Sequence, residues 1–515
     1  MQKKNRPGAT DEELAELVAE DTSRPVRPVG VNGQTEFWNA NATWFMYPPE
    51  FAFPPSPRAD GYRVRVVDAA GKVRLFDQKG PAVSLEKIWT ELPSGRTEVW
   101  CDAFHRWGIW TVARNFRVFW KMEPYRPGAY PKAPRGYAEA AMECCRYLLG
   151  CGWLRQYAAT GSPDPGYPLN CYPAKTDSAV VKLMAGFSRL SKDDRAAALR
   201  LARAAADHLI AVSQPQGAPL AHFPPTYAGG NLTAKEYAGM NMLDYPGQAG
   251  SAYLALYGET DDVKYLEAAK GIGETYLRLQ GGDGTWFLKM FEKDGRPVAA
   301  NRLHPGSVID FMDGLFKATG DRRFRECAAR AFGFYETGPL KDWNWEAQFE
   351  DVEPTERYEN LTKHPACSLA ILLAGAYPHD AGRIAQAREL LRFAEDQFVV
   401  WKRPNNRDDD DLMALPGNGW DVEPAVVEQY FYREAVDASA AKLVNTYLAL
   451  HRATGNPLDL AKARTLGDSI VRSQKDNGRI PTIWTTEVGK DARNDWINCM
   501  AMSVDALINL SSFDR

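Results

Sequence analysis

Carboxylate and indole side chains are concentrated in one ten-residue stretch, Asp-Trp-Asn-Trp-Glu-Ala-Gln-Phe-Glu-Asp, which ends at Asp351. Two neighbouring carboxyl groups can serve as a general acid and as a base or nucleophile. We predict Glu346 as one catalytic carboxylate, with Glu350 and Asp351 as further acids of the same loop. The flat rings of Trp343 and Trp345 could stack on a substrate ring. A packed loop whose acids are solvated is the alternative.

A second group of candidate site residues follows at 427–433, with the sequence Val-Glu-Gln-Tyr-Phe-Tyr-Arg. Glu428 could supply the second catalytic carboxylate, with Tyr430 as a neighbouring substrate contact. Arg433 could bind a carboxylate of the substrate, because its guanidinium group donates two parallel hydrogen bonds to such a group. A surface ion pair is the alternative.

Other candidates lie just before predicted helices or in the long loops that lead to them. Asp244 precedes a helix and is the third predicted catalytic carboxylate, although an Asp in this place is often only an N-cap. The remaining predicted substrate contacts are His222, Tyr227, His304, His364 and Trp496. We expect the histidines to form hydrogen bonds rather than to act as bases.

A repeated pattern of helices must position these residues. From residue 135 on, apolar residues recur at helical spacing, and tight turns at Gly320 and Gly455 separate consecutive helices. A second signature reads Gln-Gly-Gly-Asp-Gly from Gln280 and Gln-Lys-Asp-Asn-Gly from Gln474, and it opens longer connections. The chain therefore alternates a short turn, a helix, a long loop and another helix.

This alternation predicts twelve helices in two sets. The charged set suits an outer ring and spans 136–159, 193–213, 262–280, 321–336, 380–400 and 457–474. The set that is poorer in charge suits an inner ring and spans 176–190, 245–257, 305–319, 364–376, 437–455 and 495–510. Six such helical hairpins closing on themselves make a mainly α fold, an (α/α)6 toroid; an open solenoid is the alternative.

The toroid predicts where a site would lie. The long loops would all meet on one face, at 160–175, 214–244, 281–304, 337–363, 401–436 and 475–494. The inner helices would begin on this face, and the partial positive charge of their N-termini favours an anionic ligand. A carboxylated sugar would suit such a face, and a neutral sugar is not excluded.

The N-terminal part of the chain shows a different period. Tyr62–Val67 alternates apolar and polar residues, and short runs of the same kind follow after turn residues. We predict a small immunoglobulin-like β-sandwich over residues 26–122, preceded by a flexible N-terminus at 1–25. A Pro-rich linker at 123–134 would then join it to the catalytic toroid at 135–515.

Composition excludes several classes of protein. The 515 residues contain 62 Lys and Arg against 66 Asp and Glu, a net charge of −4, which gives nucleic-acid binding no electrostatic support. No apolar run is long enough for a membrane helix. The eight cysteines lack metal-binding spacing and the seven histidines are scattered, so we expect no metal or cofactor and mostly buried free thiols. The acidic run Asp408–Asp411 reads as a solvated segment.

The N-terminus shows no signal peptide. We therefore expect a soluble protein of the bacterial periplasm or the extracellular space if a signal was removed, and otherwise of the cytoplasm.

The helical alternation and the Gln-x-x-Asp-Gly-x-Trp junction of residues 280–286 resemble the six-hairpin glycosidases over residues 135–515. With Pro28–Gly33 and Phe37–Asn39 in the preceding sandwich, the chain looks most like the bacterial exo-β-glucuronidases of that group. The resemblance implies an exo-acting glycoside hydrolase that releases a uronic acid, in particular β-glucuronate, from oligo- or polysaccharides without a cofactor. The sequence leaves a homo-oligomer open.

Three other functions remain open at this point. The first is a polysaccharide lyase that cleaves uronate-containing glycans by β-elimination, although the heparinase type carries its sandwich after the toroid. The second is a sugar epimerase on the same toroid, and the third is a glycan-binding protein without catalytic activity. Fold analogy alone does not choose among them.

Overall fold

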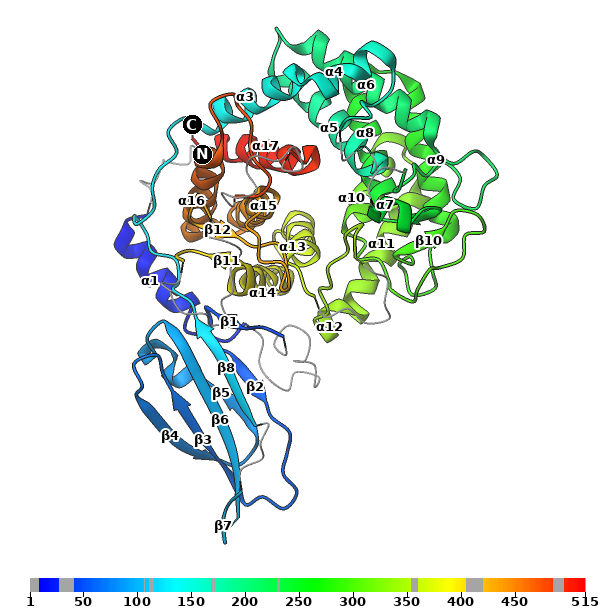
Figure 1. Cartoon of the computed structure of the whole chain (residues 1–515). Coiled ribbons are helices and arrows are strands. Elements are labelled where there is room, and N and C mark those ends of the chain that lie inside the picture. Colours follow the sequence, from blue (N-terminus) through cyan, green and yellow to red (C-terminus); the bar gives the residue numbers. More distant parts are fainter. Residues whose placement is uncertain are drawn as a thin grey trace. The chain divides into compact units, whose positions relative to one another are not determined.

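A computed structural model describes residues 9–26, 41–105, 107–110, 115–167, 170, 172–228, 232–352, 360–403, 420–484 and 495–514 (Figure 1). The chain forms two compact units. Unit 1 comprises Met1–Ala133, Lys341–Trp345 and Glu359–Ser469, and unit 2 comprises Pro134–Leu340, Glu346–Tyr358 and Ile470–Arg515. The predicted segment at 28–39 and the acidic run at 408–411 lie outside the described residues.

In the part of residues 41–121 that the structure describes, the strands form a six-stranded sheet and a two-stranded sheet. The large sheet has the order β1 (Trp44–Phe45), β8 (Phe116–Lys121), β6 (Gly95–His105), β3 (Gly61–Val67) and β4 (Val73–Gln78), with β7 (Gly108–Trp110) paired to β6. Among the strand pairs of this sheet that the structure describes, β1–β8 is parallel and the others are antiparallel. The small sheet pairs β2 (Glu50–Ala52) with β5 (Ala82–Ser84).

Aromatic packing joins the two sheets of unit 1. The ring of Phe51 on β2 lies 5.7 Å from that of Phe45 on β1 and 5.7 Å from that of Phe119 on β8. All three rings are buried, and edge-on aromatic packing adds to the stability that their burial provides. Strand β3 confirms the strand predicted at Tyr62–Val67, and β4 and β6 confirm that short strands follow it. The immunoglobulin-like type stays a prediction.

The N-terminal segment differs from its prediction as a flexible tail, because residues Asp11–Asp21 form helix α1. Thr10 and Glu13 close a capping box at its start, which satisfies two otherwise free backbone donors. At its end, Asp21 pairs with Arg392 at 3.1 Å and accepts a hydrogen bond from the Tyr47 hydroxyl at 3.1 Å. These partners of Asp21 belong to distant parts of unit 1, which local sequence patterns do not reveal.

Four long helices complete unit 1: α13 (His364–Ala376), α14 (Ala381–Phe398), α15 (Asp437–Thr454) and α16 (Pro457–Ser473), the last of which runs on into unit 2. Helix α13 packs against both α14 and α15. A short β ribbon of β11 (Val399–Val400) and β12 (Ala425–Val426) follows α14. Helix α12 (Pro339–Asp342) includes residues of both units.

Unit 2 is built from helical hairpins. Its helices are α3 (Tyr137–Gly150), α4 (Gly152–Thr160), α5 (Pro173–Leu190), α6 (Arg195–Val212), α7 (Leu232–Glu236), α8 (Tyr245–Thr260), α9 (Val263–Leu279), α10 (Gly306–Thr319), α11 (Arg322–Thr337) and α17 (Ile497–Ser511). The pairs α5–α6, α8–α9, α10–α11 and α17–α3 pack side by side, and α8 also packs against α5 and α10. A ribbon of β9 (Met240–Met242) and β10 (Lys289–Phe291) lies in the loops of this unit.

The twelve predicted helices are confirmed with one difference. The predicted helix at 136–159 is two helices, α3 and α4, because Cys151 between them has extended backbone dihedrals. The short turns at Gly320 and Gly455 carry these glycines in the left-handed region at the ends of α10 and α15.

The repeated Gln–Gly signature has one physical role at both of its positions. The Gln280 amide donates to the carbonyl oxygens of Gly284, at 2.7 Å, and of Cys327 on α11, at 3.0 Å. The Gln474 amide donates in the same way to Gly478, at 2.8 Å, and to Ala140 on α3, at 2.8 Å. Each signature therefore ties a long loop to the neighbouring outer helix.

Replacing Gly284 with alanine tests this role. Gly284 has a φ of +91°, and an added Cβ would collide with the backbone carbonyl of Arg330 on α11. We expect the free energy of unfolding to fall by about 2–4 kcal/mol, from backbone strain and overpacking together, as measured by urea denaturation. Gly217→Ala is the matched control, because Gly217 has the same φ but open space around it. It should lose only about 1–2 kcal/mol, and equal losses in both variants would contradict the packing role.

Two further expectations concern the described residues. The described cysteines, which are all except Cys171, are buried free thiols, as expected. Among the helices that the structure describes, none combines the length and the apolar character that crossing a bilayer requires.

Candidate active site

A buried carboxylate, Glu350, lies at the centre of the candidate site in unit 2. Its side chain accepts a hydrogen bond from the Lys175 ammonium group at 2.6 Å and another from the Tyr245 hydroxyl. Glu350 is only 2% exposed, and burial by itself would raise its pKa. The charge of Lys175 and the two hydrogen bonds outweigh burial and lower the pKa of Glu350, so this carboxylate is ionised at neutral pH.

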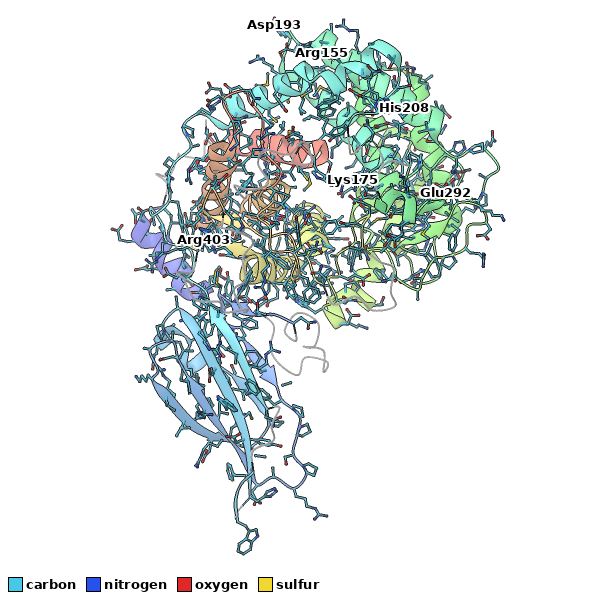
Figure 2. The ribbon with its side chains drawn as sticks, viewed as in Figure 1. Arg155, Lys175, Asp193, His208, Glu292 and Arg403 are labelled. Atoms are coloured by element: carbon cyan, nitrogen blue, oxygen red, sulfur yellow. The ribbon has the colours of Figure 1, made fainter. Side chains whose placement is uncertain are left out.

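Lys175 is in the first turn of α5 (Figure 2), and from there its ammonium group reaches Glu350. Burial would lower the pKa of Lys175, but the charge of Glu350 raises it on balance. The ammonium also lies 4.2 Å from the centre of the Trp496 ring, a distance at which a cation is attracted to the face of an indole. The pair is therefore a buried ion pair with an aromatic partner.

The next residue along the chain, Asp351, is in a different environment. Its side chain is exposed, yet the surrounding protein raises its pKa through partial desolvation, and the adjacent charge of Glu350 raises it further. The two neighbouring carboxyl groups thus have pKa values shifted in opposite directions. Such a separation is the usual arrangement when one carboxyl group donates a proton and another stays ionised.

The N-termini of four inner helices meet around this pair. Lys175 is in the first turn of α5, Tyr245 is the first residue of α8, and Trp496 is the N-cap of α17. Ser307, in the first turn of α10, donates a hydrogen bond to Asp244, which is the N-cap of α8. For these four helices of unit 2, the prediction that inner-helix N-termini share one face is confirmed.

An aromatic cluster lines the same region. It consists of Tyr167, Tyr172, Tyr227 and Tyr237 with Ala234, and Trp153, Met240 and Trp496 pack against it. The ring of Tyr172 is stacked on that of Trp496, with centres 6.2 Å apart and planes 17° apart. Trp496 is half-buried. Flat aromatic surfaces beside polar groups are typical of sites that bind sugar rings.

Two of the predicted substrate contacts, Tyr227 and Trp496, belong to this cluster. The Tyr227 hydroxyl donates to the backbone carbonyl of Glu350 at 2.7 Å, so this side chain supports the loop as well as the aromatic wall. The predicted catalytic Asp244 is half-buried and is held by Ser307 and by the Gln248 amide at 2.6 Å.

Glu346 and His304 lie together beside the start of α10 in unit 2. The Glu346 carboxylate is buried and accepts hydrogen bonds from the amides of Gln348, at 3.0 Å, and Asn301, at 3.5 Å. The backbone N–H of His304 donates to the other end of the Gln348 amide at 2.9 Å. Burial lowers the pKa of His304 to about 3, so its ring is neutral at physiological pH values. Its role as a hydrogen-bonding residue stays a prediction.

His222 is not part of the aromatic cluster. Its backbone has a φ of +66°, and its ring packs against Gly271 on α9, which belongs to the predicted outer set. A side chain on Gly271 would clash with this ring. The structure therefore gives His222 a packing role between a loop and an outer helix.

The two tryptophans predicted as stacking platforms are core residues of unit 1. Trp343 is 3% exposed and Trp345 is 0% exposed, and their rings meet edge to face at 5.7 Å. Trp343 also packs against Phe393 of α14 at 5.9 Å. Neither ring has a face left for a substrate, so the predicted stacking role of Trp343 and Trp345 is wrong. Both side chains are buried because burying a large indole in the core is strongly favourable.

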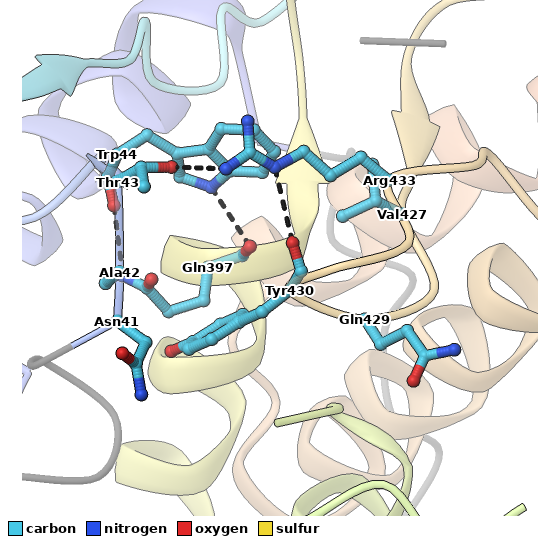
Figure 3. Close-up of a pocket in the computed structure, with 9 residues that line it drawn as sticks. All are labelled: Asn41, Ala42, Thr43, Trp44, Gln397, Val427, Gln429, Tyr430 and Arg433. Carbon is cyan, nitrogen blue, oxygen red and sulfur yellow. Dashed lines mark hydrogen bonds between the residues drawn. The ribbon is translucent and has the colours of Figure 1, made fainter. Parts of the chain in front are cut away.

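The other candidates of unit 1 lie around the β11–β12 ribbon. Arg433 donates to Thr43 at 2.7 Å and to the Tyr430 carbonyl at 3.4 Å, and its guanidinium lies 4.8 Å from the Trp44 ring (Figure 3). The hollow beside them has room for about one water molecule, which is too small for a sugar. Tyr430 is buried and stacks on Phe398.

Glu428 and His364 keep half-buried side chains in unit 1. The backbone carbonyl of Glu428 accepts a hydrogen bond from the buried Lys363 ammonium at 2.9 Å. His364 is the first residue of α13, as its prediction at a helix start requires. The catalytic role of Glu428 and the binding role of His364 stay predictions.

Sequence reasoning did not select Lys175, Tyr245 or Lys289, although all three contact the loop of Glu350. One signal could have found Lys175. A cation in the first turn of a helix opposes the helix dipole, so a lysine there implies a carboxylate partner. Within the described residues, no group of three His, Cys, Asp or Glu side chains could hold a metal ion.

Comparison with solved structures identifies the fold. A family 76 glycoside hydrolase from a bovine Bacteroides thetaiotaomicron strain is 11% identical and aligns over 88% of this chain and 93% of its own, with a TM-score of 0.50. A sugar epimerase from a ruminal bacterium is 10% identical over 74% of this chain and 99% of its own, with a TM-score of 0.52. The cellobiose 2-epimerase from Spirochaeta thermophila is 14% identical over 74% and 97%, with a TM-score of 0.50.

This likeness establishes the fold as a six-hairpin α/α toroid, which confirms the helical part of the predicted fold class. No protein-family model and no curated protein sequence matches the chain.

Proposed function

We propose that this protein is a carbohydrate-active enzyme, an exo-acting glycoside hydrolase that releases a uronic acid such as β-glucuronate. One observation carries the proposal: the exposed Asp351 has a raised pKa beside Glu350, which Lys175 keeps ionised. The aromatic cluster next to this pair supports a sugar substrate. The fold supports it too, since solved structures with this fold include a glycoside hydrolase and sugar epimerases.

In this mechanism Asp351 is the general acid. It gives its proton to the glycosidic oxygen as the bond from that oxygen to the anomeric carbon breaks. Water adds to the anomeric carbon and loses a proton to a second carboxylate, for which Asp244 at the start of α8 is our candidate within unit 2. Desolvation raises the pKa of Asp351, and the charge of Glu350, which stays ionised, raises it further.

Two features favour an acidic sugar. The ammonium group of Lys175 lies against the loop of Glu350 and Asp351. The inner-helix N-termini that meet there add partial positive charge, which stabilises a carboxylate of the substrate. Trp496, half-buried beside Lys175, offers a stacking surface for the sugar ring.

Incubation with a panel of aryl β-glycosides, the glucuronide among them, and with uronate-containing oligosaccharides tests the proposal. We expect release of free uronic acid with the gain of one water, followed by mass spectrometry. A product that absorbs in the near ultraviolet would instead indicate a lyase. A product of unchanged mass but altered configuration would indicate an epimerase, and binding without turnover would indicate a glycan-binding protein.

A further inference from the structure

Lys289 is a lysine in a place where lysines are rarely found. It lies on strand β10, opposite Met242 of β9, and only 1% of it is exposed. A buried ammonium group is costly unless several partners satisfy its three donors. The partners of Lys289 therefore indicate what its burial achieves.

Those partners are the two backbone carbonyls that flank Asp351. The Lys289 ammonium donates to the carbonyl oxygen of Glu350 at 3.1 Å and to that of Val352 at 2.7 Å. The Tyr227 hydroxyl donates to the same Glu350 carbonyl at 2.7 Å. The ammonium also lies 4.1 Å from the centre of the Tyr237 ring and 5.7 Å from that of Tyr227. One side chain thus holds the backbone on both sides of the exposed carboxyl group.

We propose that Lys289 is a positioning residue, which fixes the direction of the Asp351 side chain by holding the carbonyls of Glu350 and Val352. The predicted effect of Lys289 on turnover rests on the proposed function. Its predicted effect on the loop needs no substrate. Lys289 acts through Asp351, because its own ammonium group is buried and has no route to a bound sugar.

The arrangement also makes the loop sensitive to pH. Burial lowers the pKa of Lys289 to about 8, even though the nearby charges of Glu350, Asp351 and Glu236 raise it. The phenols of Tyr227 and Tyr237 face it as well, and burial raises the pKa of Tyr227, so that phenol stays protonated. Above about pH 8 Lys289 therefore loses one donor and its attraction to the tyrosine rings, and the loop is held less firmly.

The test compares Lys289→Met with Lys293→Met, a control because Lys293 is an exposed lysine just beyond the same strand. We expect Lys289→Met to lower kcat by roughly 10- to 100-fold, with a much smaller change in KM, because a misplaced acid slows the chemical step. Deprotonation of Asp351 should lower kcat in both proteins, but the further decline above about pH 8 should occur in the wild-type protein and be absent from this variant. The control should keep both the wild-type kcat and the decline.

A second measurement needs neither substrate nor a lysine variant. Hydrogen–deuterium exchange of peptides containing Glu350–Val352, corrected for the intrinsic effect of pH, should lose protection in the wild-type protein as the pH passes 8. Tyr227→Phe, which removes one donor to Glu350, should lose part of this protection at every pH.

The kinetic comparison and the exchange measurement together distinguish the positioning role of Lys289 from the proposed function. Unchanged exchange across pH 8, or an unchanged pH profile in Lys289→Met, would overturn the positioning role. Altered exchange without turnover of any glycoside would support the positioning role and reject the proposed function.

Discussion

Asp351→Asn is expected to lower kcat on the cleaved glycoside by roughly 10²- to 10⁴-fold, which is the usual contribution of a general acid. The amide has nearly the size of the carboxyl group but cannot give a proton to the leaving oxygen. Because the side chain is exposed, the free energy of unfolding should change little. Steady-state kinetics and urea denaturation of the same preparations measure the two quantities.

Asp193→Asn is the matched control for this substitution, since Asp193 is an exposed acid on the α5–α6 turn (Figure 2). It should retain the wild-type kcat. In the wild-type enzyme the activity should decline as rising pH deprotonates Asp351, and the raised pKa moves this decline to higher pH than for an ordinary aspartate. Full activity in Asp351→Asn would show that Asp351 is not the general acid. Glu346 and Glu428 would then be the leading candidates for this role.

Lys175→Met is expected to lower the free energy of unfolding at pH 7 by about 3–5 kcal/mol. The substitution leaves the Glu350 carboxylate buried without its cation, and the loss of a single partner from a buried ion pair is among the most destabilising changes in a core. Urea denaturation followed by circular dichroism measures the loss. Lys182→Met is the control, because Lys182 is an exposed lysine on the same helix, and it should change stability by less than about 0.5 kcal/mol.

Acidification should change the stability of the wild-type protein and of Lys175→Met in opposite directions. In the wild-type protein the pKa of Glu350 is lowered on folding, so its contribution to stability is present above the unfolded pKa and is lost as the pH falls through the folded pKa. Without Lys175, burial raises the folded pKa above the unfolded value, and acidification should relieve the loss.

The double variant Lys175→Met with Glu350→Gln should recover much of the stability, because no uncompensated charge remains. Additive effects of the two substitutions would show that the pair is not coupled, contrary to the structure.

Local patterns were sufficient to predict the helices and several strands of this protein. The spacing of apolar residues, the glycines at helix ends and the capping residues act over a few positions, so the chain reveals them directly. The alternation of short turns and long loops was enough to predict the toroid and to place inner-helix N-termini on one face. It also located the loop of residues 342–351 as the richest source of site residues.

Only the tertiary structure decided which side chains of that loop are available for chemistry. The sequence alone does not distinguish Trp343 and Trp345 from tryptophans that stack on a ligand, yet both are buried. Glu346 and Glu350 look alike in the sequence, but Glu350 pairs with a lysine on a helix 175 positions away, and Glu346 accepts hydrogen bonds from two amides. Burial and ion pairing depend on neighbours brought together by folding, and the pKa of a carboxyl group depends on both.

The sequence by itself thus determined the secondary structure, the order of the helical hairpins and the face on which a site should lie, because the interactions responsible are short-range. The tertiary structure decided that Lys175 keeps Glu350 ionised, that Asp351 is exposed beside it, and that Lys289 and Tyr227 hold the backbone between them. These contacts join residues more than sixty positions apart, and their energies come from desolvation and charge, which no local pattern encodes.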